Sequence, residues 1–224
     1  MVRVSLYVEG GGEIGQQNKY LAIEMRRAFK RFLTNSGIPD NQFNVVRCGS
    51  RDQAYQKFCS AIQDSGSTHF PLLLVDSEEA VPAKTNPWDH LKQRDKWDKP
   101  TGAEDIHVHL MVQCMESWFL ADKQKLVGYY GQGFQIASVP ATQPVESAMK
   151  EDILSALSKA SQRTTKGSYS KGNHSFAILE SLDPEKVAQA SPWACRMLQV
   201  LGDKLNIPKS NRKWTKCTVP EFSK

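Results

Sequence analysis

Hydrophobic residues first alternate with polar ones and then recur at helical spacing. Val4, Leu6 and Val8 occupy every second position, which predicts a strand that ends at Glu9. Three glycines at 10–12 allow a tight turn, and an amphipathic helix is expected after them. Its apolar stripe comprises Leu21, Met25, Ala28, Phe29 and Phe32.

Two further strands and a helix are predicted in the next part of the chain. Residues 44–48 form a short strand, and residues 51–64 form a helix with Ala54, Phe58, Ala61 and Ile62 on its inner side. Residues 69–75 are continuously apolar, which is typical of a central parallel strand covered on both faces. Pro71 is expected at the entry of this strand, because proline is poorly tolerated inside a central strand.

A long connection, 79–104, separates the third strand from the fourth. It is expected to include a short helix at about 88–97. Residues 105–113 alternate cleanly and predict a strand, and a helix is expected to open at Ser117. The order of elements favours an α/β fold with a mainly parallel sheet flanked by helices.

The remainder is predicted to be helical, at about 145–162 and 173–182 and then after two capped prolines, Pro184 and Pro192. Ala194, Met197, Leu198, Leu201 and Leu205 form the apolar face of the last helix. Residues 209–224 are expected to form an exposed basic tail. We therefore divide the chain into an α/β domain, 1–125, and a helical extension, 126–224.

Composition is that of an ordinary globular protein. The chain has 224 residues, 40% of them hydrophobic and 24% charged, and its net charge of +5 permits a polyanionic partner without requiring one. No apolar run approaches the roughly 18 residues of a membrane span. Five widely spaced cysteines without a Cys-x-x-Cys pair predict free, mostly buried thiols. These features predict a cytoplasmic protein with neither a signal peptide nor a membrane partner.

Acidic side chains follow three of the predicted strands. Glu9 ends the first, Asp76 and Glu78 follow the third, Glu116 follows the fourth, and Glu13 comes four residues after Glu9. Ligands of open α/β sheets bind beyond the carboxyl ends of the strands, and gathered carboxylates call for a hard cation. One or two Mg²⁺ or Mn²⁺ ions are expected. The alternative is that these acids are solvated strand ends or helix caps.

The glycine turn also matches a different motif. Gly10, Gly12 and Gly15 fit the dinucleotide-binding pattern G-x-G-x-x-G between a strand and a helix. Glu9 and Glu13 would place negative charge where the pyrophosphate must lie, and the second strand has no terminal acid for a ribose hydroxyl. A nucleotide-binding enzyme therefore remains a third hypothesis, behind the metal site and a binding module.

Glu9, Asp76 and Glu78 resemble the Toprim domain of primases, topoisomerases and overcoming-lysogenization-defect nucleases. In that domain a glutamate follows the first strand, and an Asp-x-Asp or Asp-x-Glu pair follows a later one. The nuclease branch is similar further on, with Glu13, Glu116 and Lys171 as matches to its additional glutamates and lysine. The Toprim-like part covers about 1–125.

The segment 115–122, Met-Glu-Ser-Trp-Phe-Leu-Ala-Asp, resembles a signature of small bacterial Toprim-like proteins of unassigned function, of the DUF4276 type. Such proteins are often found in phage-defence operons beside an ATPase of the SMC/ABC type. The resemblance implies a metal-dependent nuclease that acts on DNA or on RNA such as tRNA, as the effector of a defence system with that ATPase as a possible partner. A homodimer is also possible.

Within this resemblance, Glu9, Asp76 and Glu78 hold the first metal, and Glu13 and Glu116 hold or orient the second. An activated water attacks the phosphodiester, and Lys171 stabilises the developing charge. His174 is expected to contact a phosphate or donate a proton. The alternative for Lys171 and His174 is a solvated linker followed by a capping histidine. For the whole protein it is a non-catalytic partner-binding or regulatory subunit with an acidic pocket.

Two other groups of side chains are weaker candidates for ligand binding. His107 and His109 share one strand face and could hold a metal, but packing under a helix is favoured for them. Trp88 and Trp97 lie among Lys92, Arg94 and Lys96 and could stack on bases, whereas nearby aspartates favour an ordinary amphipathic segment.

Overall fold

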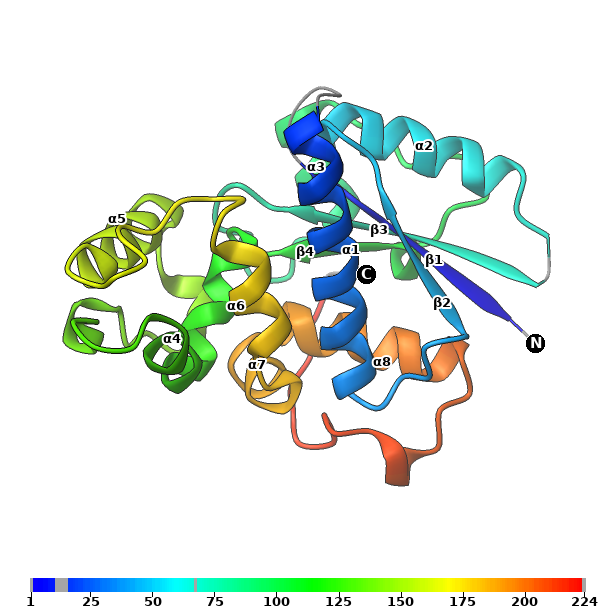
Figure 1. Cartoon of the computed structure of the whole chain (residues 1–224). Coiled ribbons are helices and arrows are strands. Elements are labelled where there is room, and N and C mark those ends of the chain that lie inside the picture. Colours follow the sequence, from blue (N-terminus) through cyan, green and yellow to red (C-terminus); the bar gives the residue numbers. More distant parts are fainter. Residues whose placement is uncertain (1, 11–15, 67, 223–224) are drawn as a thin grey trace.

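Four parallel strands form the centre of the protein. The computed structural model describes residues 2–10, 16–66 and 68–222. Its sheet has the order β2-β1-β3-β4, and every neighbouring pair is parallel (Figure 1). The strands are β1 (Arg3–Val8), β2 (Phe43–Arg47), β3 (His69–Asp76) and β4 (Val108–Met111). Because all four run in one direction, the residues that follow them meet at one edge of the sheet.

Helices cover both faces of this sheet. Leu72 and Leu74 of β3 belong to one buried cluster, whereas Leu73 and Val75 belong to the other, as the alternation of a strand requires. The first cluster contains α1, α6, α7 and α8, and the second contains α2 and α3. The helices are α1 (Gln16–Asn35), α2 (Arg51–Gln63), α3 (Pro87–Asp95), α4 (Lys123–Tyr130), α5 (Lys150–Ser161), α6 (Ser175–Ser181), α7 (Pro184–Ala190) and α8 (Pro192–Lys204).

This architecture confirms the predicted α/β class with a parallel sheet flanked by helices. Four of the five residues in the predicted stripe of α1 are buried, and Leu21 is partly exposed. All four residues predicted on the inner side of α2 are buried. Ser50 caps α2 by accepting a hydrogen bond from the Gln53 backbone N–H, and Asp183 and Ser191 cap α7 and α8 before their prolines.

Pro71 lies within β3 and not merely at its entry. It pairs with Ser5 of β1, whereas β4 pairs with β3 only from Leu73 onward. Among the described residues, one side of β3 therefore has no partner strand at Pro71. A residue without a backbone N–H is tolerated there, as it is on an edge strand.

Boundaries differ most from the predictions in two places. The strand predicted at 105–113 is shortened to β4, because Asp105–His107 forms a 3₁₀ turn and Met115–Asp122 is a 3₁₀ helix. The helix predicted from Val145 begins only at Lys150, whose backbone N–H donates to Gln113 Oε1 at 3.2 Å. Shorter 3₁₀ turns cover Ile136–Ser138, Val145–Ser147 and Lys209–Asn211.

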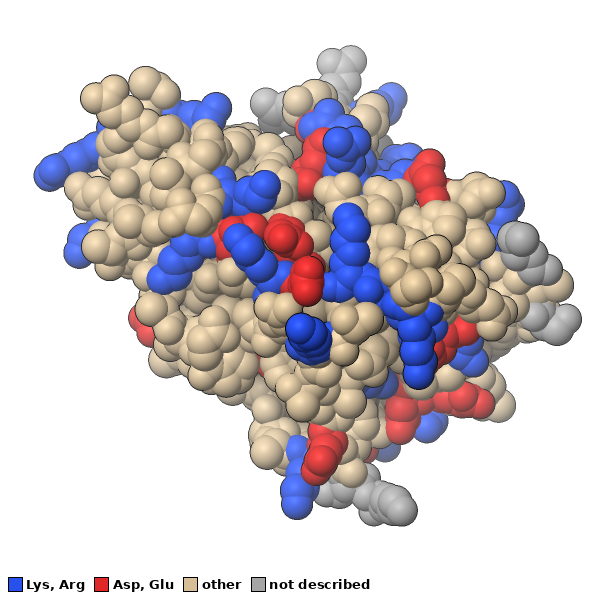
Figure 2. Space-filling model, turned by 90° about the horizontal axis from the view of Figure 1, so that it is seen from below, with Lys and Arg blue, Asp and Glu red and all other residues tan. Residues whose placement is uncertain are grey.

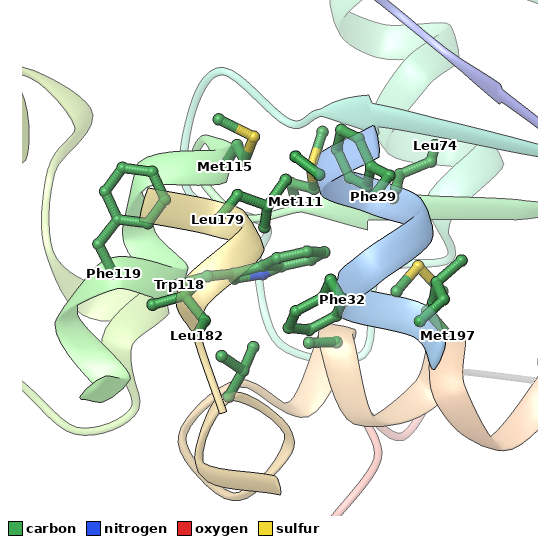
Figure 3. Close-up of a cluster of buried hydrophobic side chains, with 14 of the residues drawn as sticks. Phe29, Phe32, Leu74, Met111, Met115, Trp118, Phe119, Leu179, Leu182 and Met197 are labelled. Carbon is green, nitrogen blue, oxygen red and sulfur yellow. The ribbon is translucent and has the colours of Figure 1, made fainter. Parts of the chain in front are cut away.

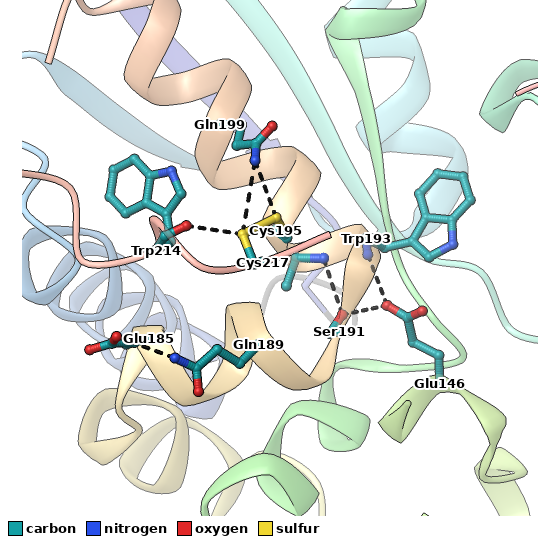
Figure 4. The surroundings of a disulfide bond; sticks show 10 residues. Glu146, Glu185, Gln189, Ser191, Trp193, Cys195, Gln199, Trp214 and Cys217 are labelled. Carbon is teal, nitrogen blue, oxygen red and sulfur yellow. Dashed lines mark hydrogen bonds between the residues drawn. A yellow bond between two sulfur atoms is a disulfide. The ribbon is translucent and has the colours of Figure 1, made fainter. Parts of the chain in front are cut away.

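The C-terminal segment is held against the protein, so the prediction of an exposed basic tail is wrong for part of it. Trp214 is 2% exposed, and Cys217 forms a disulfide with Cys195 of α8 (Figure 4). The expectation of five free thiols is therefore also wrong, although Cys48, Cys59 and Cys114 are free. The two cysteines are 22 positions apart in the sequence, and they meet only because the chain between them folds back along α8. Their spacing alone therefore did not indicate a disulfide.

The larger buried cluster joins the two halves of the chain. Trp118 stacks on Phe32 of α1 with ring centroids 5.3 Å apart, and Leu179 and Leu182 lie beside them (Figure 3). Side chains from both sides of the predicted boundary at residue 125 thus share one core, and the division into two domains stays a prediction. Among the described residues, no helix is both long and apolar enough to cross a membrane.

Surface charges are mixed where the molecule is seen from below. Lys and Arg side chains lie next to Asp and Glu side chains on this face (Figure 2). The described residues also form salt bridges between opposite charges, such as Arg27–Glu180 at 2.8 Å and Lys186–Asp122 at 2.8 Å. The net charge of +5 does not spread as an unbroken basic surface over this face.

Candidate metal centre

Three of the predicted acids meet at the carboxyl edge of the sheet. One carboxylate oxygen from each of Glu9, Asp76 and Glu78 lies within 4.8 Å of the other two. Glu9 follows β1 and Asp76 ends β3, and these strands are neighbours in the sheet. The parallel topology therefore brings together side chains that are far apart in the sequence.

Glu9 is fixed by two partners. Its Oε1 accepts a hydrogen bond from the Asp76 backbone N–H at 3.2 Å, and its Oε2 accepts one from Arg51 Nη1 at 3.1 Å. Burial raises the pKa of Glu9 and Glu78 adds to the rise, while Arg51 opposes it. Arg51 stands in the first turn of α2, and its other nitrogens bond to Asp95 at the end of α3. The Arg51 guanidinium thus connects α2 and α3 to the acidic residues at the edge of the sheet.

Asp76 is the most deeply buried of the three acids, at 5% exposure. Its Oδ1 accepts a hydrogen bond of 2.8 Å from the Met115 backbone N–H, and its Oδ2 lies 3.5 Å from Lys171 Nζ. Burial, followed by the charge of Glu9, raises the pKa of Asp76 to about 8. The lysine only partly offsets the cost of ionising this carboxyl group.

Glu78 occupies the turn after β3 in the left-handed region, with φ of 68°. Its backbone N–H donates to the carbonyl of Gln113 at 2.8 Å, which fixes the turn against the loop after β4. Its carboxylate pairs with Lys150 of α5. Burial favours a higher pKa for Glu78, but the hydrogen bond and charge of Lys150 outweigh burial and the pKa is lowered. Non-glycine residues adopt this backbone conformation rarely, and such residues cluster at functional sites.

Glu116 lies behind Asp76 with its side chain fully buried. Tyr169 Oη donates to its Oε1 at 2.6 Å, and Lys171 Nζ lies 3.5 Å from its Oε2. That Oε2 atom accepts no hydrogen bond from the described residues. Burial of Lys171 favours a lower pKa for its ammonium group. The pKa is nevertheless raised, because Asp76 and Glu116 stabilise the charged form. The lysine therefore bridges two buried carboxylates.

A pocket of about 490 Å³ opens beside these acids. Its charged wall includes the three acids with Glu116, Arg51 and Lys171. The pocket also has an apolar lining, formed by α1 and α6 together with a methionine at the end of β4 and another after it. The volume lies within the roughly 300–1,000 Å³ of small-molecule sites.

The structure separates the remaining predicted site residues from this cluster or does not describe them. Glu13 lies outside the described residues. His174 Nδ1 lies 3.1 Å from Tyr130 Oη and accepts a hydrogen bond from the Ser170 backbone N–H at 3.3 Å. It thus supports the turn that carries Lys171 and does not contact the acids. A catalytic role for His174 stays a prediction.

The weaker candidates are structural. His109 is buried against Arg196, whose Nη1 lies 2.9 Å from its Nδ1, and the His107 ring stacks on Phe70. Trp88 and Trp97 are 4% and 5% exposed and pack under α2, so neither offers a face to a base.

Several residues of the site were not predicted. Arg51 follows β2 at the same sheet edge as the acids, so the argument used for the acids could have found it. Tyr169 stands two residues before Lys171 and belongs to no sequence pattern that indicates a site. Lys150 belongs to no such pattern either, because its contact with Glu78 spans 72 positions of sequence.

The donor set fits a hard divalent cation. Carboxylate oxygens are the ligands that Mg²⁺ and Mn²⁺ prefer. The buried Glu116 Oε2 lacks a hydrogen bond, and the charge of Asp76 is incompletely compensated. Both observations indicate that the cluster can accept further positive charge.

The chain belongs to a protein family. The family model described as "Domain of unknown function (DUF4276)" matches residues 8–202, which confirms the DUF4276-type resemblance. This range includes Glu9, Asp76, Glu78, Glu116 and Lys171. No curated protein and no solved structure matches the chain.

Proposed function

We propose that this protein is a Mg²⁺- or Mn²⁺-dependent nuclease that hydrolyses phosphodiester bonds in DNA or RNA. The observation that carries the proposal is the convergence of Glu9, Asp76 and Glu78 within 4.8 Å at a sheet edge that opens into a pocket. A lysine at 3.5 Å from Asp76 supplies positive charge in the same place. Metal-dependent phosphodiester hydrolysis uses acidic side chains that hold the metal ion, and it uses positive charge that stabilises the phosphate.

Each residue is assigned a role by its position. Glu9, Asp76 and Glu78 would hold the ion, and Glu116, with Glu13 as predicted, would hold or orient a second one. A bound ion of this kind supplies a water activated for attack and neutralises charge on the phosphate. Lys171 reaches the pocket from the side of Asp76 and Glu116, where it stabilises negative charge that develops on the phosphate. Arg51 and Tyr169 are positioning residues, since they hold Glu9 and Glu116 in place.

The proposal also includes a biological setting. The resemblance of segment 115–122 and membership of the DUF4276 family support an effector of a bacterial anti-phage defence system. An ATPase of the SMC/ABC type would be its partner and would restrain it in the cytoplasm. A homodimer belongs to the same proposal.

One observation favours a second candidate function. Glu9, Glu78 and Asp76 are already neighboured by Arg51, Lys150 and Lys171, respectively. A pocket balanced in this way could serve a non-catalytic Toprim-like subunit that binds or regulates a partner. In that case the acids would stabilise the fold and would not hold an ion.

A cleavage assay separates the two candidates. Wild type and the variants Glu9→Gln and Asp76→Asn are incubated with labelled DNA and tRNA in Mn²⁺ or in EDTA. The nuclease predicts cleavage that needs both metal and acids, with a loss of at least about 100-fold in each variant. Glu185→Gln, which changes an acid of α7 outside the pocket, is the matched control and should cleave as wild type does. Cleavage that persists in Asp76→Asn would reject this centre.

A further inference from the structure

The pocket has an apolar wall that metal chemistry does not need. This wall comprises Leu21 and Met25 of α1, Met111 at the end of β4, Met115 after it, and Phe176 of α6. Leu21 and Phe176 are only partly buried, so their side chains face the opening as well as the core. A hydrolytic site that contacted only a phosphate and its ions would have no use for this surface.

The charged and apolar walls enclose one space. Lys171 and Phe176 stand five positions apart, on the turn before α6 and in its first turn, and both line the pocket with Arg51 and Asp76. A ligand that fills the pocket therefore presents an anionic end to Lys171 and a flat apolar part to Phe176. A nucleotide has this combination of groups in one molecule.

We infer that the pocket takes an unpaired nucleotide, whose base lies against Phe176 and the apolar wall while its phosphate lies at Lys171 and the acidic cluster. This inference rests on the proposed nuclease function and names its substrate class as single-stranded nucleic acid. A base within a duplex is stacked on both faces and cannot enter a pocket unless it is unpaired and turned out. Stacking of a base on an aromatic ring is also largely indifferent to sequence.

The experiment compares one sequence as a single strand and as a blunt duplex. Cleavage is measured in Mn²⁺, and binding is measured by fluorescence anisotropy in Ca²⁺, for wild type, Phe176→Ala and Phe176→Leu. The leucine variant keeps an apolar side chain in the core and removes only the flat ring. Phe134→Ala is the control, because Phe134 is a partly buried phenylalanine that packs on the same core outside the pocket.

Wild type is expected to bind and cut the single strand at least about tenfold better than the duplex. Both Phe176 variants are expected to lose about tenfold in single-strand affinity, with duplex binding unchanged and Phe134→Ala at the wild-type level. Equal action on both substrates, or a loss in the Phe176 variants no larger than in Phe134→Ala, would overturn the inference. Competition with a nucleoside monophosphate tests whether the pocket takes a free nucleotide or a nucleotide within a strand. Strong competition would assign the pocket to the free nucleotide and would also overturn the inference.

These results are distinguishable from failure of the proposed function. Cleavage that depends on Asp76 but does not discriminate between single strand and duplex would uphold the nuclease and reject the nucleotide pocket. Single-strand binding that depends on Phe176 without any cleavage would uphold the pocket and reject the nuclease. Neither binding nor cleavage of any strand would reject both.

Discussion

Tyr169 donates a hydrogen bond of 2.6 Å to Glu116 across 53 positions of sequence, and both side chains are buried. The tyrosine lies in the segment between α5 and α6, whereas the glutamate lies in the first turn of the 3₁₀ helix after β4. This contact attaches the helical part of the chain to the acidic edge of the sheet. Lys171, two residues after Tyr169, is thereby brought to within 3.5 Å of Asp76.

Removal of this hydroxyl group is expected to destabilise the protein. In Tyr169→Phe the buried Glu116 Oε1 loses the hydrogen-bond donor that it has among the described residues, so the free energy of unfolding should fall by about 1–3 kcal/mol. Denaturant titration measures the change. Tyr20→Phe, at a side chain that is 65% exposed, should have no effect. Equal stability of Tyr169→Phe and wild type would show that the contact does not hold Glu116.

Lys171→Met is expected to separate metal binding from cleavage. Loss of a positive charge 3.5 Å from Asp76 should tighten Mn²⁺ binding about tenfold. Cleavage should nevertheless fall by about 100-fold or more, because charge on the phosphate loses its stabilising partner. Calorimetry and single-turnover assays provide the two readouts.

The control for this variant is Lys186→Met, which breaks an ion pair with Asp122 outside the pocket. It should change neither quantity. Weaker Mn²⁺ binding in Lys171→Met would mean that the lysine organises the acids and does not compete with the ion for them.

The acidic centre was predictable because its members obey a local rule. Glu9, Asp76 and Glu78 each follow a strand with a clear hydrophobic pattern, and parallel strands place such residues together. Glu116 was found in the same way. The partners Lys150 and Tyr169 come from helical and irregular segments, where no periodic pattern relates one residue to another that lies far away in the sequence.

The fold shows the same limit. The α2 stripe, four of the five stripe residues of α1 and the capped prolines were predicted correctly, since spacing and capping chemistry are local properties. The path of the C-terminal segment was not predicted, because Trp214 is buried and Cys217 is bonded to Cys195 through contacts with α8 that depend on the tertiary fold.

Glu146 is expected to make stability depend on pH. It accepts hydrogen bonds from Ser191 and from the Trp193 backbone N–H, the latter at 3.0 Å, near the start of α8 (Figure 4). Burial raises its pKa from 4.5 to about 7, although both hydrogen bonds oppose the rise. Because the pKa of Glu146 is higher in the folded than in the unfolded protein, the protonated side chain contributes to stability. This contribution is fully present below about pH 4.5 and is lost as the pH rises through about 7.

Glu146→Gln keeps a hydrogen-bond acceptor and removes the titration. Between pH 4.5 and 9 the unfolding free energy of wild type should fall by about 3 kcal/mol relative to this variant. Denaturant titrations across this range test the difference. Parallel pH profiles for the two proteins would contradict the assignment.

The disulfide between Cys195 and Cys217 is expected to stabilise the protein by about 3 kcal/mol, from the entropy of closing a loop across 22 positions. A reductant should lower the melting temperature of wild type by about 6–12 °C and leave Cys217→Ser unaffected. Cys59→Ser, which removes a free thiol, should respond to the reductant as wild type does. Five titratable thiols in the untreated, unfolded protein would show that the bond does not form.

Thermal melting with and without millimolar Mn²⁺ tests the metal centre most directly, because it requires neither a substrate nor a partner. An ion present at about 100 times its Kd adds about 2.7 kcal/mol of stability, which raises the melting temperature of wild type by about 5–10 °C. This rise should vanish in Glu9→Gln/Asp76→Asn and persist in Asp203→Asn, at an acid that pairs with Arg212 outside the pocket. No rise in wild type, or an equal rise in the double variant, would contradict a metal site at Glu9, Asp76 and Glu78.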